Sequence, residues 1–96
     1  MVVRYPDTAT IHVVTPTITD GEVTSEDEST VQIAGRLELS TGRRVEKAPG
    51  QYTDLKGTFF TIMSPVSNAK KLTVSGETYE IIKWVPYQTY NEIWLD

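Results

Sequence analysis

The alternation of apolar and polar side chains between Val31 and Leu39 limits what this chain can fold into more than any other feature. The apolar or small residues occupy every second position, namely Val31, Ile33, Gly35, Leu37 and Leu39. Because successive side chains of a β-strand point to opposite faces of its sheet, this pattern predicts a strand with one buried face. A glycine on the buried side predicts a tight bend or a bulge, of the kind that curls a sheet into a barrel.

Other segments rich in β-branched and aromatic residues predict that the rest of the chain also consists of strands. The strongest hairpin joins residues 72–74 and 79–85 through a turn at 75–78. Further strands are predicted at 9–14, 57–63 and 88–95, with a turn at 40–42 and at most one helical turn at 67–71. We therefore predict an all-β fold, a single domain of residues 1–96. Six or seven short strands form an antiparallel meander closed into a small barrel, with one long loop and little or no helix.

Two polar segments interrupt the strands, and both are predicted to be loops. Residues 17–29 carry five carboxylates and predict a solvated acidic loop; these are Asp20, Glu22, Glu26, Asp27 and Glu28. Residues 46–57 are longer than an ordinary hairpin connection of about two to five residues, and such excursions are usually functional or disordered. We interpret the second segment as a projecting interaction loop, with plain flexibility as the alternative.

The residues assigned to that interaction loop are Glu46, Lys47, Pro49, Gly50, Gln51, Tyr52, Thr53, Asp54, Leu55 and Lys56. Tyr52 and Leu55 in its middle are apolar and have no evident reason to be exposed in an isolated molecule. Both are therefore expected to contact a partner.

The charge balance argues against a protein that grips nucleic acid. Nine basic residues stand against thirteen acidic ones, and the net charge is −4. Proteins that bind phosphates without sequence preference usually have a basic excess on one face. The chain contains no cysteine, which excludes disulfides and thiolate metal sites. It also shows neither a signal-like start nor an apolar stretch near the ~20 residues of a membrane span, so no membrane partner is expected.

No constellation of reactive residues points to an enzyme. His12 is the only histidine, and it lies between Ile11 and Val13 on the opposite face of a strand, as a surface histidine would. The sequence has no glycine-rich phosphate loop and no H-E-x-x-H motif. The acidic segment lacks the ligand spacing of a calcium loop, which makes calcium the weaker alternative there. We predict no catalytic residue, no metal site and no cofactor.

Aromatic residues crowd the last part of the chain, at Tyr79, Trp84, Tyr87, Tyr90 and Trp94. Strands usually use such residues for core and cross-strand packing. Tyr79 and Ile81 alternate on one face, whereas Ile82 and Trp84 have the other phase, so both faces of this strand are partly apolar. One of these faces is therefore predicted to meet another subunit or protein.

The last strand leads to the same hypothesis of an interface. If Ile93 and Leu95 fill the core, Trp94 is left on the outside, where an aromatic anchor is a common interface hot spot. The predicted subunit-interface residues are Trp94, Tyr90 and Ile82. The alternative is an OB-like or SH3-like barrel that binds a ligand or single-stranded nucleic acid by stacking on Tyr79, Trp84 and Trp94.

From about Val31 onward, the order of elements resembles the head-completion proteins of tailed bacteriophages, also called head-closure, stopper or head–tail connector proteins. The features that carry the resemblance are the strand 31–36, the long polar segment, the strand 57–60, the hairpin 72–81 and the final strand 90–95. Within the hairpin, Gly76 to Ile81 follow the pattern G-x-x-Y-x-I. The resemblance covers about two-thirds of the chain.

The resemblance implies a non-enzymatic protein of the virion neck that is made in the host cytoplasm and assembles into a ring, commonly a dodecamer. The ring would lie between the portal or adaptor and the tail-terminator protein. Residues 46–56 would then face the channel or a partner, and packaged double-stranded DNA would pass nearby without being tightly bound. An acidic balance suits such a conduit because it repels phosphates. Residues 17–29 have no counterpart in the family and could be an adaptor-facing insertion; another tail or neck component is a third interpretation.

Overall fold

The computed structural model describes residues 6–39 and 43–96, and most of these residues belong to β-strands. The strands are β1 (Asp7–Thr19), β2 (Glu22–Leu39), β3 (Arg44–Ala48), β4 (Gln51–Asp54), β5 (Gly57–Thr61), β6 (Ala69–Val74), β7 (Glu77–Pro86) and β8 (Asn91–Leu95). The described residues contain no helix, which confirms the all-β prediction. The turn expected at 40–42 lies outside the described residues. No helix in the described part of the chain could cross a membrane.

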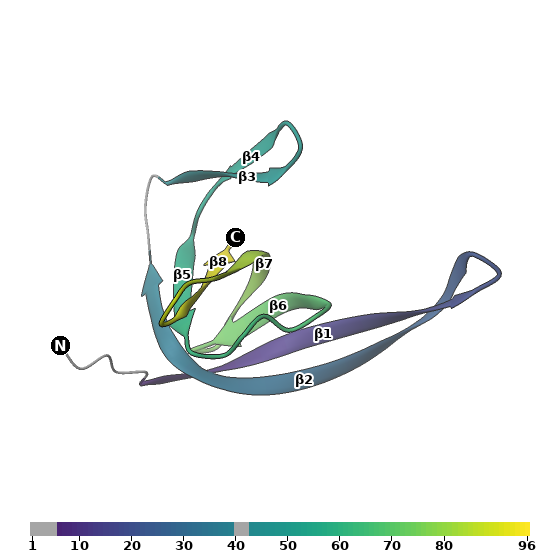
Figure 1. Ribbon diagram of the computed structural model, residues 1–96, viewed down its shortest axis with the longest axis horizontal. Helices are drawn as coiled ribbons and strands as arrows, with labels where there is room; N and C mark the ends of the chain where they lie inside the picture. The colour runs from purple at the N-terminus through teal and green to yellow at the C-terminus, as the bar shows by residue number, and fades with distance from the viewer. Residues whose placement is uncertain (1–5, 40–42) are drawn as a thin grey trace.

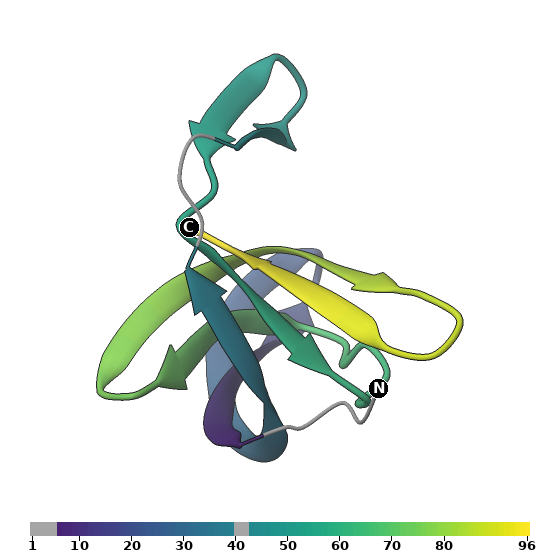
Figure 2. The ribbon, with the colours of Figure 1, turned by 90° about the vertical axis from the view of Figure 1, so that its left-hand side faces the viewer.

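Six strands close into a barrel in the order β1-β2-β5-β8-β7-β6, and every neighbouring pair is antiparallel. The predicted closed barrel is therefore present. Its connectivity is not a simple meander, because β5 and β6 follow one another in the chain but lie on opposite sides of the ring. Residues 62–68 have to pass across one end of the barrel to join them (Figure 2).

Alternate side chains of the strands fill the barrel. The fully or nearly fully buried members of this core are Ala9, Ile11, Val13, Ile33, Phe59, Leu72, Val74, Ile93 and Leu95. Val31, Ile33 and Leu37 all pack into or against it, as the alternation in this strand predicts. Leu39 at the end of β2 is 71% exposed and does not. Antiparallel strands with one buried face are the expected product of this period-2 pattern.

Gly35 has a different role from the predicted bulge. Its register is regular on both sides, where it pairs with Asp7 and Thr61. A Cβ at this position would lie 2.1 Å and 2.4 Å from Cε2 and Cζ of Phe59, and 2.4 Å from the carbonyl oxygen of Phe60. The glycine therefore leaves the space that the largest buried ring of the core occupies.

A β-bulge in β7 accounts for the two apolar faces predicted for that strand. The register with β8 shifts between Ile81, which pairs with Leu95, and Lys83, which pairs with Trp94. The extra residue reverses the phase, so that Ile81 and Trp84 both pack against the core. The bulge therefore explains the position of Trp84, whereas Ile82 and Val85 are half-buried outside the core cluster.

Two β-ribbons extend beyond the barrel (Figure 1). The first, which we call the arm, comprises residues 15–30 at the far ends of β1 and β2. The prediction of a loop at 17–29 was wrong, because these residues continue the two strands. They turn at Asp20 and Gly21, whose φ angles are 53° and 80°. Two consecutive residues with positive φ make a type I′ turn, for which Asp-Gly is a preferred sequence.

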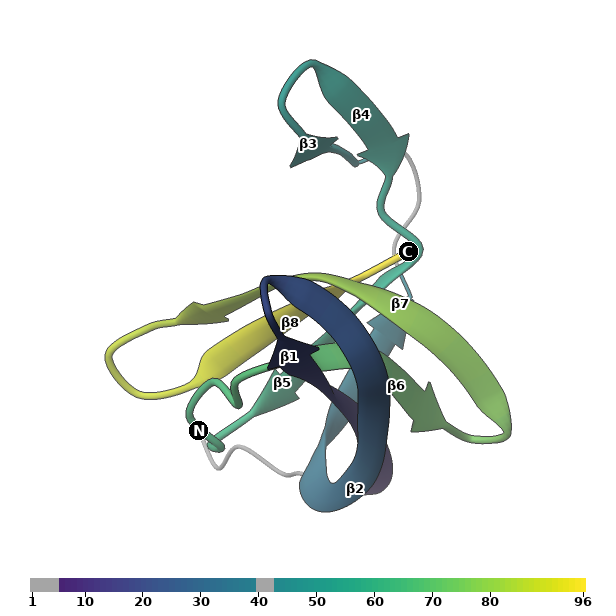
Figure 3. The same ribbon diagram turned by 90° about the vertical axis from the view of Figure 1, so that its right-hand side faces the viewer.

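The second ribbon is the hairpin of β3 and β4, which leaves the barrel in a different direction from the arm (Figures 1 and 3). The segment 46–57 does project, but the prediction of a loop was wrong here too. Ala48 pairs with Gln51, and Pro49 and Gly50 form the turn between them, with Gly50 at φ 76°. Pro-Gly therefore marks the middle of a hairpin and not the start of an irregular excursion.

Candidate interaction surfaces

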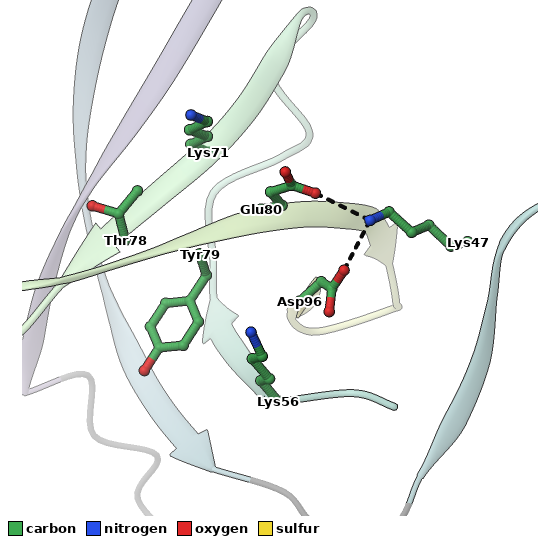
Figure 4. A pocket seen from close by; sticks show the side chains of 7 residues that line it. All are labelled: Lys47, Lys56, Lys71, Thr78, Tyr79, Glu80 and Asp96. Carbon is green, nitrogen blue, oxygen red and sulfur yellow. Dashed lines mark hydrogen bonds and ion pairs between the residues drawn. The ribbon is translucent and has the colours of Figure 1, made fainter. Parts of the chain in front are cut away.

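The β3–β4 hairpin is tied to the barrel by an ion-paired cluster around Lys47, which lies close to the turn of the hairpin (Figure 4). The Nζ of Lys47 donates to Oδ2 of Asp96 at 2.9 Å and to Oε2 of Glu80 at 3.2 Å. The hydroxyl of Thr53 donates to the other carboxylate oxygen of Asp96 at 3.1 Å. One residue of each hairpin strand thus holds the same carboxylate, and this fixes the direction in which the hairpin projects.

Electrostatics reinforce this anchor. The hydrogen bond from Lys47 lowers the pKa of the Asp96 carboxyl below its ordinary value, and the hydrogen bond from Thr53 acts in the same direction. Reciprocally, the hydrogen bonds to Asp96 and Glu80 raise the pKa of the Lys47 amine. The pair is therefore charged over the whole neutral range.

The hairpin is expected to loosen from the barrel in acid before the barrel itself unfolds. Because the folded-state pKa of Asp96 is lowered, the anchor stabilises the docked hairpin above the ordinary carboxyl pKa of about 4. That stabilisation is lost as the pH falls through the lowered value. Amide exchange by NMR should show protection in β3 and β4 falling with acid while β8 stays protected. An Asp96→Asn variant should show weak hairpin protection already at neutral pH. Equal amide protection of the hairpin at neutral and at acidic pH would contradict the assignment of Asp96 as the residue that holds the hairpin on the barrel.

Not all of the predicted loop residues are available to a partner. Leu55 is only 2% exposed, and its backbone N–H donates to the carbonyl oxygen of Arg43 at 2.7 Å. The expectation that Leu55 would be an exposed anchor is therefore wrong, since its side chain is buried within the molecule. Tyr52 is 59% exposed, so its side chain is accessible. The other exposed residues of the segment are Glu46, Lys47, Pro49, Gly50, Gln51, Asp54 and Lys56, whereas Thr53 is half-buried.

A hollow of about 490 Å³ lies between the hairpin and the barrel. It is lined by Lys47, Lys56, Lys71, Thr78, Tyr79, Glu80 and Asp96 (Figure 4). Its two carboxylates are both engaged by Lys47. Neither Lys56 nor Lys71 forms an ion pair with a described residue. The positive charge of Lys56 nevertheless helps to lower the pKa of the Asp96 carboxyl. The hollow therefore carries three ammonium groups against two carboxylates, a net charge of +1, and Lys71 lies opposite Glu80 in the β6–β7 register.

Trp94 lies on the outside of the barrel, as predicted. Its neighbours Ile93 and Leu95 are both 0% exposed in the core. The indole N–H of Trp94 donates to Oε1 of Glu92 at 3.1 Å. The guanidinium of Arg43 lies 4.9 Å from the ring centroid, and the Lys83 ammonium lies 5.8 Å from it. The ring is thus held half-buried by cation–π contacts with two basic side chains.

A second aromatic group lies beside this tryptophan on the same outer side of β8. Tyr90 stacks on Tyr87 with ring centroids 5.2 Å apart, and it meets Phe60 at 6.0 Å. Partial burial, and then the nearby Glu92 carboxylate, raise the pKa of the Tyr90 hydroxyl. Ile82, the third predicted interface residue, is half-buried at the β7 bulge.

The three rings proposed for a stacking platform do not share a face. Tyr79 and Trp84 pack against the core, whereas Trp94 is on the outside. The indole Nε1 of Trp84 and the Oδ1 of Asn91 are both buried without a hydrogen-bond partner among the described residues. A platform built from Tyr79, Trp84 and Trp94 together would need a different arrangement of these strands.

His12 and the acidic residues were the remaining candidates for chemistry. His12 points away from the core, and its Nε2 lies 2.8 Å from the hydroxyl of Thr73. That hydroxyl lies 2.8 Å from the hydroxyl of Thr78. Within residues 6–39 and 43–96, no group of three or more His, Cys, Asp or Glu side chains is placed to hold a metal ion. Asp20, Glu22, Glu26, Asp27 and Glu28 are instead spread along the exposed arm.

No family model matches the chain, and no curated protein matches it either. The fold and the surfaces define a structural class on their own, which is a small closed β-barrel with two β-ribbons that project in different directions.

Proposed function

We propose that this chain is a non-enzymatic structural protein of the neck of a tailed-bacteriophage virion. In this role it forms a ring that closes the DNA-filled head, and it joins the portal or adaptor to the tail-terminator protein. The observation that carries the proposal is the architecture, a small barrel with two projecting ribbons whose outer residues are not used in its own core. Barrels packed side by side can build such a ring, and ribbons can reach the layers above, below or within it.

The charge of the chain supports the same role. A net charge of −4 disfavours tight contact with phosphates, and a conduit for packaged DNA has to let the duplex slide. The half-buried aromatic side chains of Tyr90 and Trp94 offer anchors of the type that dominates protein–protein interfaces. The exposed Tyr52 near the tip of the β3–β4 hairpin is a third anchor of this type.

Deletion of the gene from the phage genome that encodes the chain is expected to give DNA-filled heads that leak DNA or do not join tails. Electron microscopy of the lysate and a titre of infectious particles measure this outcome. Expression of the wild-type chain from a plasmid should restore joined particles. Normal infectious particles from a clean deletion would rule out the proposal.

A further inference from the structure

Among residues 6–39 and 43–96, no other strand pairs with the arm. Every residue from Thr15 to Thr30 is exposed. Strand β6 pairs with β1 only at residues 9–13, and β5 pairs with β2 only at residues 35–39. The N–H of Val14 still donates to the carbonyl oxygen of Asn68 at 3.0 Å, and from residue 15 to residue 30 the described strands pair only with each other. An isolated two-stranded ribbon is marginally stable in water. At its end, Ile18 and Val23 form a cross-strand pair with exposures of 64% and 59%.

The arm also differs in charge from the rest of the chain. Residues 15–30 contain five carboxylates and no lysine or arginine, which gives them a net charge of −5. Because the whole chain has a net charge of −4, all the other residues together carry +1. Glu26 and Glu28 lie two residues apart in one strand, so their side chains share a face of the ribbon.

The complementary surface is the hollow beside the β3–β4 hairpin. Lys56 and Lys71 line it together with Lys47, and these three ammonium groups against the carboxylates of Glu80 and Asp96 give the hollow a net charge of +1. Complementary potentials steer association and fix its register. The hollow and the arm belong to the same chain, so each copy carries both halves of such a contact.

The arm and the hairpin leave the barrel in different directions (Figures 1 and 3). An arm cannot enter the hollow of its own molecule unless the β1–β2 ribbon folds back on itself. We infer that the acidic arm of one copy binds in the lysine-lined hollow of a second copy, with Glu26 and Glu28 facing Lys56 and Lys71. This contact is heterologous, and its repetition builds a closed ring or an open chain. The inference rests on the ring of the proposed function and specifies how neighbouring subunits would be joined.

A charge swap in the full-length purified protein tests this contact. Glu26→Lys with Glu28→Lys reverses the two charges of the arm that would face the hollow. Lys56→Glu with Lys71→Glu reverses the two charges of the hollow that would face the arm. Each double variant is expected to associate about tenfold or more weakly than the wild type in sedimentation velocity, because like charges then face each other. Combining all four changes restores opposite charges and should bring association back close to the wild-type level. A structural role of these residues would not give this rescue.

A variant of matched net charge controls for a general effect of charge. Glu46→Lys with Asp54→Lys changes the net charge by the same amount as the arm reversal, but on exposed positions of the hairpin. It should not weaken association. Should a hollow variant fail to fold by circular dichroism, Lys56→Gln with Lys71→Gln replaces it and should still weaken association. Raising the salt from about 0.1 M to about 1 M shortens the Debye length from about 10 Å to about 3 Å, so it should also dissociate the wild-type complex.

Three results would overturn the inference. One is a wild-type protein that stays monomeric up to its solubility limit, and another is an arm variant that associates as well as the wild type. The third is a quadruple variant with no rescue. If the arm variant associates normally but is excluded from particles, the arm binds a different component and this inference fails. The gene deletion tests the proposed function separately, since tail-less heads would uphold it whatever joins the subunits.

Discussion

Phe59→Ala is expected to lower the free energy of unfolding by about 3–5 kcal/mol, a large share of the 5–10 kcal/mol that a domain of this size has. Phe59 is 0% exposed and is the largest fully buried side chain among the described residues. It lies on β5, which pairs with β2 on one side and β8 on the other. Removing the ring leaves a cavity in the middle of the barrel, which closed strands cannot easily collapse to fill.

Thermal melts and urea titrations of Phe59→Ala measure this loss. At about 4 °C or more for each kcal/mol, the melting temperature should fall by at least about 12 °C. The matched control is Phe60→Ala, the next residue of the same strand. Phe60 is half-buried on the outer side, where it contacts Tyr90, so its replacement should cost much less. A control that melts as low as Phe59→Ala would show that the inward and outward faces of β5 are reversed.

Local patterns in the sequence were sufficient to predict the strands of the barrel. The alternation from Val31 to Leu37 faces the core as predicted. The hairpin of β6 and β7 turns at Ser75 and Gly76, inside the predicted turn, with φ angles of 53° and 79°. The outward position of Trp94 followed from the inward pair Ile93 and Leu95. In each case one face of the strand is buried. A buried face requires apolar residues at alternate positions, and this alternation predicts which side chains point inward.

The two ribbons were missed because neither has a buried face along most of its length. Without a core to face, residues 17–29 show no apolar alternation, and their acidity suggested a loop. The turn Asp20-Gly21 was the available signal, since Asp-Gly flanked by β-branched residues is a strong mark of a hairpin. Pro49-Gly50 is the corresponding signal for the turn between β3 and β4.

The bulge in β7 and the cation–π contacts of Trp94 depend on residues far apart in the chain. A strict period of two placed Ile82 and Trp84 on one face, and only pairing with β8 shows the extra residue that changes the phase. Asp96 and Lys47 are 49 positions apart, yet they share an ion pair. Such contacts follow from the closure of the barrel and leave no local pattern.

Gly35→Ala is expected to destabilise the fold by about 3 kcal/mol, the upper part of the usual range for overpacking a core. The cause is steric, since the added Cβ would lie 2.1 Å from a ring atom of Phe59 and 2.4 Å from the backbone oxygen of Phe60. The ring could give way only by leaving its position in the core, and the carbonyl only by a shift of β5. Gly57→Ala in the same pair of strands is the matched control, because its nearest atom would be 3.0 Å away.

A double-mutant cycle with Phe59→Leu shows whether the clash with the ring is the cause. Leucine lacks the ring atoms that the new Cβ would meet, so Gly35→Ala should cost less in the Phe59→Leu background than in the wild type. Residues in direct contact typically couple by about 0.5–3 kcal/mol, which urea titrations of the four proteins can resolve. The oxygen of Phe60 remains close in both backgrounds, so part of the cost should persist. Strictly additive free energies would mean that Gly35 is required by the path of the β2 backbone and not by the ring packed against it.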